Sequence, residues 1–346
     1  MKQTFEYYAV DPGTWKDAER LDKIESCNIV RDLEVGTLGS ASISSDTDYS
    51  DKYVRCYLVT EQNGVTEKEV LGTHIYQTPS IEYSSTRRTS SQEGYTPLVE
   101  LEEKMPPYGY CLFRGENIID IATKIVSEQA RAPVSPGDST GTLTDDFVSS
   151  TDDTWLSFVS DLIANDKYHL GLEPDGRIVF EKNQEVASLS PIWTFDDGNS
   201  SILYPDVTLS RDLYGIPNVV EVIYSPSNGV AKYVRVVNDD PASPTSTVNR
   251  GRQIVYRDTS PNVVDTITDA QLEEYAKHVL KEKSSLEYTL TYRHGYCPVR
   301  IGDCVMLNYE RADLRNIKAK VIRQTIKCAT GCSVEETAIF SKQLWG

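Results

Sequence analysis

The chain has 346 residues, of which 39% are hydrophobic and 25% charged, and its 52 acidic and 35 basic side chains give a net charge of −17. This length allows two or more domains with cores of their own, and the composition excludes a disordered protein. The acidic excess excludes a protein that wraps nucleic acid, because phosphate contacts need clustered Lys and Arg. The charge suits a surface that DNA passes without sticking, or it serves solubility alone.

Targeting signals and cysteines indicate where the chain is made. No run of about eighteen apolar residues occurs, so no transmembrane helix is expected. The N-terminus lacks the apolar stretch that a secretory signal requires. The seven cysteines form an odd, scattered set, which predicts reduced thiols and synthesis in a cytoplasm. Cys56 and Cys304 lie inside apolar strand patterns and are expected to be small core residues.

Residues 1–111 are expected to form a first barrel-like β domain. Residues 53–59 alternate between two faces, as a half-buried strand does. Asn63-Gly64 follows, and because both residues tolerate positive φ the pair predicts a hairpin turn. Residues 70–76 are the expected return strand.

Residues 112–205 change to helical spacing and are expected to form a small α+β insert. Asn117 can cap a first helix, which starts at Ile118. Apolar side chains then recur at the spacing of an amphipathic helix, namely Trp155, Phe158, Val159, Leu162 and Ile163. A hairpin around Pro174-Asp175-Gly176 should follow.

Residues 206–245 and 286–346 are expected to form a second barrel-like β domain, interrupted by a helix-containing excursion at 246–285. A hairpin should join the strands at 219–224 and 232–237. Thr268 can cap the helix of the excursion, with Gln271 as its capping-box partner. Further strands are expected at 253–257, 288–292, 303–309, 318–327 and 334–340. The predicted fold class is therefore α+β and rich in β structure.

Pairs of adjacent carboxylates are the first candidates for catalysis: Asp145-Asp146, Asp152-Asp153, Asp196-Asp197, Asp239-Asp240, Glu273-Glu274 and Glu335-Glu336. A glycosidase holds two carboxylates across one sugar, whereas adjacent residues on a strand point to opposite faces. We therefore expect none of these pairs to be catalytic, and we expect Asp152-Asp153 in the first turn of a helix. Asp196-Asp197-Gly198-Asn199 hints at a calcium loop but lacks the bidentate Glu of an EF-hand, so a turn is expected.

Zinc is the metal to consider, with His294, Cys297 and Cys304 as candidate ligands and Cys328 and Cys332 nearby. Their Cys-x6-Cys and Cys-x3-Cys spacings differ from the CxxC knuckles of zinc sites. The sequence shows no HExxH, phosphate-binding or dinucleotide-binding pattern, and no nucleophile elbow is expected. We predict no catalytic, cofactor-binding or metal-binding residues and no enzyme activity. An enzyme built on an unmarked Cys–His pair stays open as an alternative.

The order of the expected elements resembles the phage tail hub family. This family includes baseplate hub proteins, late-control D-type proteins and the N-terminal heads of tail-associated lysins. The resemblance is carried mainly by Leu203–Val207, Tyr214–Val222, Val299–Val305, Val321–Phe340 and the helix at 269–283.

The resemblance implies a structural protein without catalytic residues. Such hubs are trimers in which each subunit contributes two related barrel-like domains. The resulting ring of six similar units matches the six-fold tail tube above it, while the spike or fibre below is three-fold. The similar strand, loop and long return strand at 53–83 and 305–339 would fit such a repeat.

The resemblance also implies partners and a location. The expected partners are two further copies of this chain, a tail tube or distal tail protein above, a spike, fibre or tip protein below, and a tape measure protein. DNA would cross the channel without specific binding, and the chain would not insert into a membrane. The expected location is the virion tail tip, after synthesis in the host cytoplasm.

Two alternatives stay open. One is a hub-like head of a tail-associated cell-wall hydrolase, although an ending directly after the last strand, at Gly346, favours the plain hub. The other is the equivalent hub of a tail-like bacteriocin or a secretion system.

Overall fold

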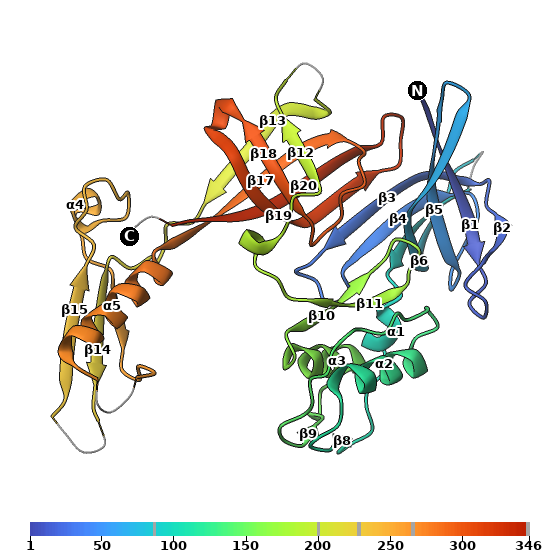
Figure 1. The fold of residues 1–346 in the computed structure, drawn as a ribbon. Coiled ribbons are helices and arrows are strands. Elements are labelled where there is room, and N and C mark those ends of the chain that lie inside the picture. Colours follow the sequence, from blue (N-terminus) through green and yellow to red (C-terminus); the bar gives the residue numbers. More distant parts are fainter. Residues whose placement is uncertain (86–87, 199–200, 227–229, 264–266, 344–346) are drawn as a thin grey trace. The chain divides into compact units, whose positions relative to one another are not determined.

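The computed structural model describes residues 1–346 except 86–87, 199–200, 227–229, 264–266 and 344–346. The chain folds as two compact units (Figure 1). Unit 1 contains residues 1–207 and 291–338, and unit 2 contains residues 208–290 and 339–346. Strands dominate and helices are few, so the predicted β-rich α+β class is confirmed.

The first seven strands of unit 1 form a continuous antiparallel array. They are β1 (Lys2–Val10), β2 (Asp17–Arg20), β3 (Ile24–Asp32), β4 (Gly39–Ser45), β5 (Tyr53–Gln62), β6 (Val65–Tyr83) and β7 (Arg88–Tyr95). Asn63 and Gly64 join β5 to β6 with φ angles of 53° and 79°, and Gln62 pairs with Val65. Two consecutive positive φ values are the geometry of a tight two-residue hairpin, so the predicted turn is confirmed.

Strands from the end of the chain complete the same sheet. They are β12 (Trp193–Asp196), β13 (Leu203–Arg211), β17 (Ser285–Gly295), β18 (Cys304–Tyr309), β19 (Leu314–Lys327) and β20 (Ser333–Gln343), with a 3-10 turn at Glu310–Ala312. The strand order is β13-β17-β20-β19-β3-β4-β7-β6-β5-β1-β2, and β18 pairs with β19 and β12. Pairing of β19 with β3 joins the two ends of the chain. The predicted boundaries of two separate barrel-like domains stay a prediction.

The predicted insert is a cluster of helices and short strands in unit 1. Within 112–205 it contains α2 (Ile118–Gln129), β9 (Phe147–Val148), α3 (Trp155–Ala164), β10 (Tyr168–Leu172), β11 (Ile178–Lys182) and a 3-10 turn at Val186–Ser188. The short helix α1 (Val99–Glu102) and strand β8 (Cys111–Leu112) begin before the predicted boundary and belong to the same cluster. In Figure 1 the three helices lie together beside β10 and β11.

The two longer helices of the insert follow the sequence pattern. The side chain of Asn117 accepts a hydrogen bond from the Asp120 amide and caps α2, while Thr154 caps α3. The apolar residues predicted for α3 are all buried in one core with those of α2. One expectation was wrong: Asp152 and Asp153 precede the cap residue Thr154 instead of lying in the first turn of α3.

Unit 2 is a three-stranded sheet covered by one helix. Its strands β14 (Val219–Tyr224), β15 (Lys232–Val237) and β16 (Val255–Asp258) lie in the order β15-β14-β16, accompanied by the short helix α4 (Thr247–Arg250). Helix α5 (Asp269–Lys283) packs its apolar stripe on this sheet. The predicted capping box of Thr268 and Gln271 is confirmed. The predicted turn between β14 and β15 lies partly outside the described residues.

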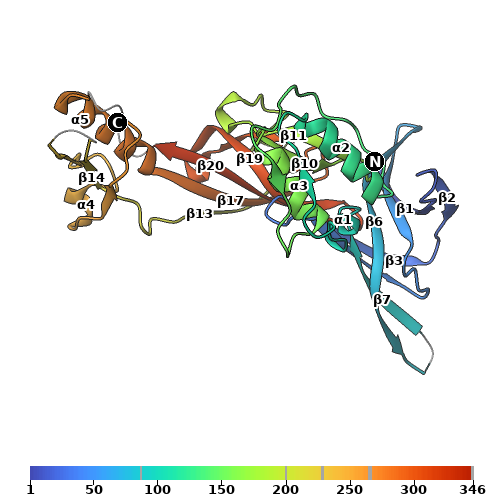
Figure 2. The ribbon, with the colours of Figure 1, turned by 90° about the horizontal axis from the view of Figure 1, so that it is seen from below.

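Two surface features complete the description. Figure 2 shows β6 and β7 of unit 1 running together as a projecting hairpin, on which the Tyr83 side chain is 77% exposed. No helix in the described ranges has both the length and the apolar character that crossing a membrane requires.

Candidate functional site

Unit 1 contains a cavity of about 460 Å³. Its walls come from β3, from the middle of β6, from the β10–β11 hairpin of the insert and from the loop before β18. The described lining residues include no Cys and no Ser. A nucleophile of the usual serine or cysteine kind is therefore not presented to this cavity.

Several charged residues of the cavity wall contact one another. His169 Nε2 lies 3.2 Å from Glu181 Oε2, and Arg300 forms an ion pair with Glu173. Asp303 Oδ2 accepts a hydrogen bond from the Arg300 amide at 2.7 Å. Burial raises the pKa of the Asp303 carboxyl. The Arg300–Glu173 pair connects the β10–β11 hairpin to the loop before β18.

His74 is the buried histidine of this wall. Burial, and to a lesser extent the charge of Arg31, lowers the pKa of His74 to about 3. The imidazole is therefore neutral at physiological pH and packs as a polar core residue.

A second polar cluster is buried where β3, β17, β19 and β20 meet. The Tyr292 hydroxyl donates to Glu336 Oε2 at 2.7 Å, and Gln324 Nε2 donates to Glu336 Oε1 at 2.5 Å. His294 Nε2 lies 3.2 Å from the same Oε1, while His294 Nδ1 lies 2.7 Å from the Gly295 carbonyl oxygen. His294 Nε2 is therefore within ion-pair distance of Glu336 but has no hydrogen-bond partner among the described residues.

This cluster is connected to the N-terminal strands. Arg31 donates to Gln324 Oε1 at 2.9 Å and to the Leu71 carbonyl oxygen at 2.7 Å. Glu336, Gln324 and His294 are each no more than 1% exposed. Buried polar groups connected across several strands help to specify how those strands pack, so we assign the cluster a structural role.

The adjacent carboxylates considered above either lie in different surroundings or accept hydrogen bonds from backbone amides. Glu336 is buried, whereas Glu335 is exposed and pairs with Arg293 at 3.0 Å, as the opposite faces of a strand require. Asp196 accepts a hydrogen bond from the Gly198 amide and Asp197 from the Glu310 amide. Asn199 lies outside the described residues.

In each remaining pair, at least one carboxylate makes a hydrogen bond or an ion pair. Asp146 accepts from the Arg114 amide, Asp153 from the Ser150 amide and Asp240 from the Ala242 amide. Glu273 and Glu274 both bind Lys277 on the surface of α5.

One sequence pattern runs against the expectation of no nucleophile elbow. Residues 137–141 read Gly-Asp-Ser-Thr-Gly, which matches GxSxG. An elbow places its serine on a sharp turn from a strand into a helix. Here Ser139 lies in the loop between α2 and β9, and its hydroxyl donates to Asp166. Among the described contacts of Ser139 there is no histidine.

The structure brings together only part of the zinc candidates. Cys297 Sγ lies 3.7 Å from His294 Nδ1. Cys304 and Cys332 belong to no group of potential metal ligands within the described part of the chain. Cys328 instead joins two cysteines of the N-terminal strands, Cys27 and Cys56.

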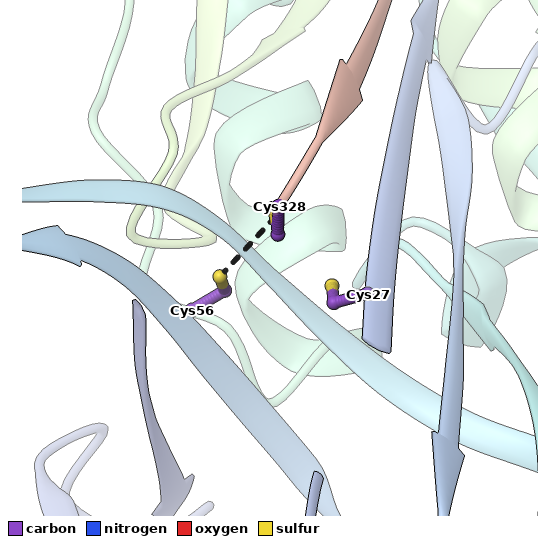
Figure 3. Close-up of side chains that lie close together, drawn as sticks. All are labelled: Cys27, Cys56 and Cys328. Atoms are coloured by element: carbon purple, nitrogen blue, oxygen red, sulfur yellow. Dashed lines mark hydrogen bonds between the residues drawn. The ribbon is translucent and has the colours of Figure 1, made fainter. Parts of the chain in front are cut away.

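These three cysteines form the only group of potential metal ligands found among the described residues, and their sulfur atoms all lie within 4.8 Å of one another. Figure 3 shows the three side chains converging from β3, from β5 and from the segment after β19. The sulfur atoms of Cys56 and Cys328 are 3.8 Å apart. Sequence spacing gives no signal for this group, because 272 positions separate Cys56 from Cys328.

The sequence matches no family model and no curated protein. The fold, in contrast, matches solved structures. A tail protein from Neisseria meningitidis shares 15% identity and a TM-score of 0.62, over 100% of this chain and 98% of that chain. The 43 kDa tail protein of prophage MuSo2 from Shewanella oneidensis shares 12% identity and a TM-score of 0.63, over 97% and 98%.

A third solved structure comes from a secretion system. The E. coli c3393 protein, a component of the type VI secretion system with structural similarity to the T4 bacteriophage tail proteins gp27 and gp5, shares 11% identity and a TM-score of 0.52. The match covers 94% of this chain and 76% of that chain. The chain therefore has the fold of phage tail proteins, which is the fold that its resemblance to the phage tail hub family implies.

Proposed function

We propose that the chain is a structural tail hub of a bacteriophage, without enzyme activity. Three copies would form a ring that adapts the six-fold tail tube to a three-fold tip or spike and lines the DNA channel. The observation that carries the proposal is the match to the Neisseria tail protein along 100% of this chain and 98% of that chain. One shared architecture thus accounts for nearly the whole of both proteins.

Open sheet edges support a role in an assembly. β13 and β2 stand at the two ends of the strand order. Most residues of β13 and all those of β2 are exposed. Exposed strand edges invite pairing with another chain, and closed rings of subunits remove such edges.

The projecting β6–β7 hairpin supports the same role. It offers an exposed ladder of strand residues, including Tyr83, beyond the rest of the sheet of unit 1 (Figure 2). Tyr combines a large apolar ring with a polar tip, a composition that suits contacts between subunits.

The net charge of −17 supports the channel. Proteins bind duplex DNA through Lys and Arg side chains that contact its phosphates and release the condensed counterions. A net-acidic wall repels phosphate over about 8–10 Å at physiological salt, the range set by screening. DNA would therefore pass such a wall without being held.

A second candidate function is the equivalent hub of a secretion system. The similarity to the E. coli type VI component favours it. The neighbouring reading frames distinguish the two, because a phage hub lies among genes for a tape measure protein and for spike or baseplate proteins.

Cryo-electron microscopy of intact particles tests the proposal directly. We expect three copies of the chain in a ring at the tail tip, with a net-acidic wall around the lumen. A peripheral location, another copy number or an inner wall lined mainly by Lys and Arg would overturn it.

The hydrolase alternative has its own assay: lysis of peptidoglycan in a zymogram, abolished by a single acidic substitution, would establish it.

A further inference from the structure

We propose that Cys27, Cys56 and Cys328 bind a thiophilic divalent cation, Zn²⁺ in the cell, and so tie together three strands from distant parts of the chain. The proposal goes beyond the tail-hub function, which requires no metal. It departs from the expectation drawn from cysteine spacing, because the ligands meet only in the folded sheet.

The distances between the sulfur atoms carry the proposal. Zinc–thiolate bonds are about 2.3 Å long, which places two sulfurs of a tetrahedral site about 3.8 Å apart. The sulfurs of Cys56 and Cys328 are separated by 3.8 Å. All three sulfurs lie within 4.8 Å of one another, so an ion at their centre would be about 2.2–2.8 Å from each.

Two ligands stand on strands, and the third directly follows one. Cys328 directly follows β19, and its amide donates to the Cys27 carbonyl oxygen at 3.0 Å. Cys56 lies on β5, paired with Tyr7 of β1 and with Gly72 of β6. Each thiol is at most 7% exposed. A site built on paired strands keeps its geometry better than a site on loops.

The surroundings can stabilise negative sulfur. Tyr7 and Tyr76 lie in the same buried core as the three cysteines, and their hydroxyl groups are potential hydrogen-bond donors. Hydrogen-bond donors around metal ligands orient them and favour the thiolate.

Binding would exchange protons for the metal. Each thiol that is protonated in the free protein gives its proton to solvent as its bond to the cation forms. No oxidant or reductant takes part. Soft thiolate ligands select zinc, cadmium and monovalent copper over magnesium and calcium.

Titration of the reduced, metal-free full chain with Cd²⁺ tests the site. We expect an ultraviolet thiolate-to-cadmium band that saturates at one equivalent, and a cadmium NMR signal in the range of sulfur ligands. One equivalent of Zn²⁺ should compete for the site and raise the midpoint of urea unfolding.

Two variants separate the site from general effects. Cys56→Ala should abolish the band, whereas Cys332→Ala should keep it, because Cys332 is equally buried in the same core but is not one of the converging sulfurs. A band that persists in Cys56→Ala, or a wild-type chain that shows neither the band nor a response to Zn²⁺, would overturn the proposal. If Cys56→Ala fails to fold, the cadmium NMR signal of the wild-type chain decides, since it reports the ligand type without any substitution.

Discussion

Glu335 and Glu336 are neighbours in sequence with opposite surroundings. Glu335 is exposed and paired with Arg293, while Glu336 is fully buried beside His294, Tyr292 and Gln324. An exposed ion pair contributes at most about 1 kcal/mol. A buried one is costly to break, because the remaining partner keeps its desolvation penalty.

We predict that Glu336→Leu lowers the free energy of unfolding by about 3–5 kcal/mol, because His294 and Gln324 would lose their buried partner. Glu335→Leu, on the next position of the same strand, should change it by less than about 1 kcal/mol. Urea unfolding followed by circular dichroism measures both values. Similar losses in the two variants would show that the buried cluster is not structural.

His74 predicts a dependence of stability on pH. Its pKa is about 3 in the folded chain, mainly because of burial, and about 6.5 in an unfolded one. The unfolded state therefore takes up a proton first as the pH falls. The contribution of His74 to the free energy of unfolding is therefore fully present above about pH 6.5. It falls on acidification, by about 2 kcal/mol between pH 7 and pH 5.

Urea midpoints at pH 5 and pH 7 measure this loss. His74→Gln should flatten the dependence, because its side chain does not titrate. His278→Gln, which changes an exposed histidine of α5, should leave the wild-type dependence intact. An unchanged slope in His74→Gln would refute the assignment.

At the scale of elements, turns and caps are set by a few residues. Gly64 has a φ of 79° and Gly295 has a backbone outside the left-handed region, yet an added Cβ would meet open space at both positions. The two glycines thus differ in backbone conformation, but at neither position would an added Cβ clash with a neighbouring atom.

We predict that Gly64→Ala destabilises the chain by about 1–2 kcal/mol, because an L-residue is strained at positive φ. Gly295→Ala should be neutral or slightly stabilising, since alanine restricts the unfolded chain. Urea midpoints of the two variants compare them. An equal effect of both substitutions would contradict the role of φ.

Local signals made most individual elements predictable. Asn63-Gly64, the cap residues Asn117 and Thr268 and the apolar stripe of α3 act within a few residues, so they are visible in sequence. Partners of strands are different. No residue near β3 in the sequence indicates that this strand pairs with β19. The convergence of Cys27, Cys56 and Cys328 depends on that pairing and is therefore not predictable from the sequence.

At the scale of the whole molecule, each unit has a core of its own. The core of unit 2 is built from residues between Val220 and Leu280. Ser210 Oγ donates to the Thr289 carbonyl oxygen at 3.3 Å, which holds the flanking ends of β13 and β17 side by side. Segments with separate cores fold independently as a rule.

We predict that replacing residues 214–284 with a short Gly/Ser linker leaves unit 1 folded. Trp15, Trp155 and Trp193 all lie in unit 1, so tryptophan fluorescence reports its unfolding. With Trp345→Phe in both proteins, the urea midpoint of the shortened chain should match that of the full-length chain within error. A shortened chain that cannot fold would show that the two units depend on each other.

The pairing of β3 with β19 has a consequence for biosynthesis. Asn28 pairs with Lys327, so this edge of β3 stays unpaired until the roughly 300 residues between the two positions have been synthesised. At about 5–20 residues per second, that interval is roughly 15–60 s. During it, one edge of β3 and the apolar face around Cys27 are uncovered, which is the condition that attracts chaperones. The yield of this protein should therefore depend on the folding machinery of its host.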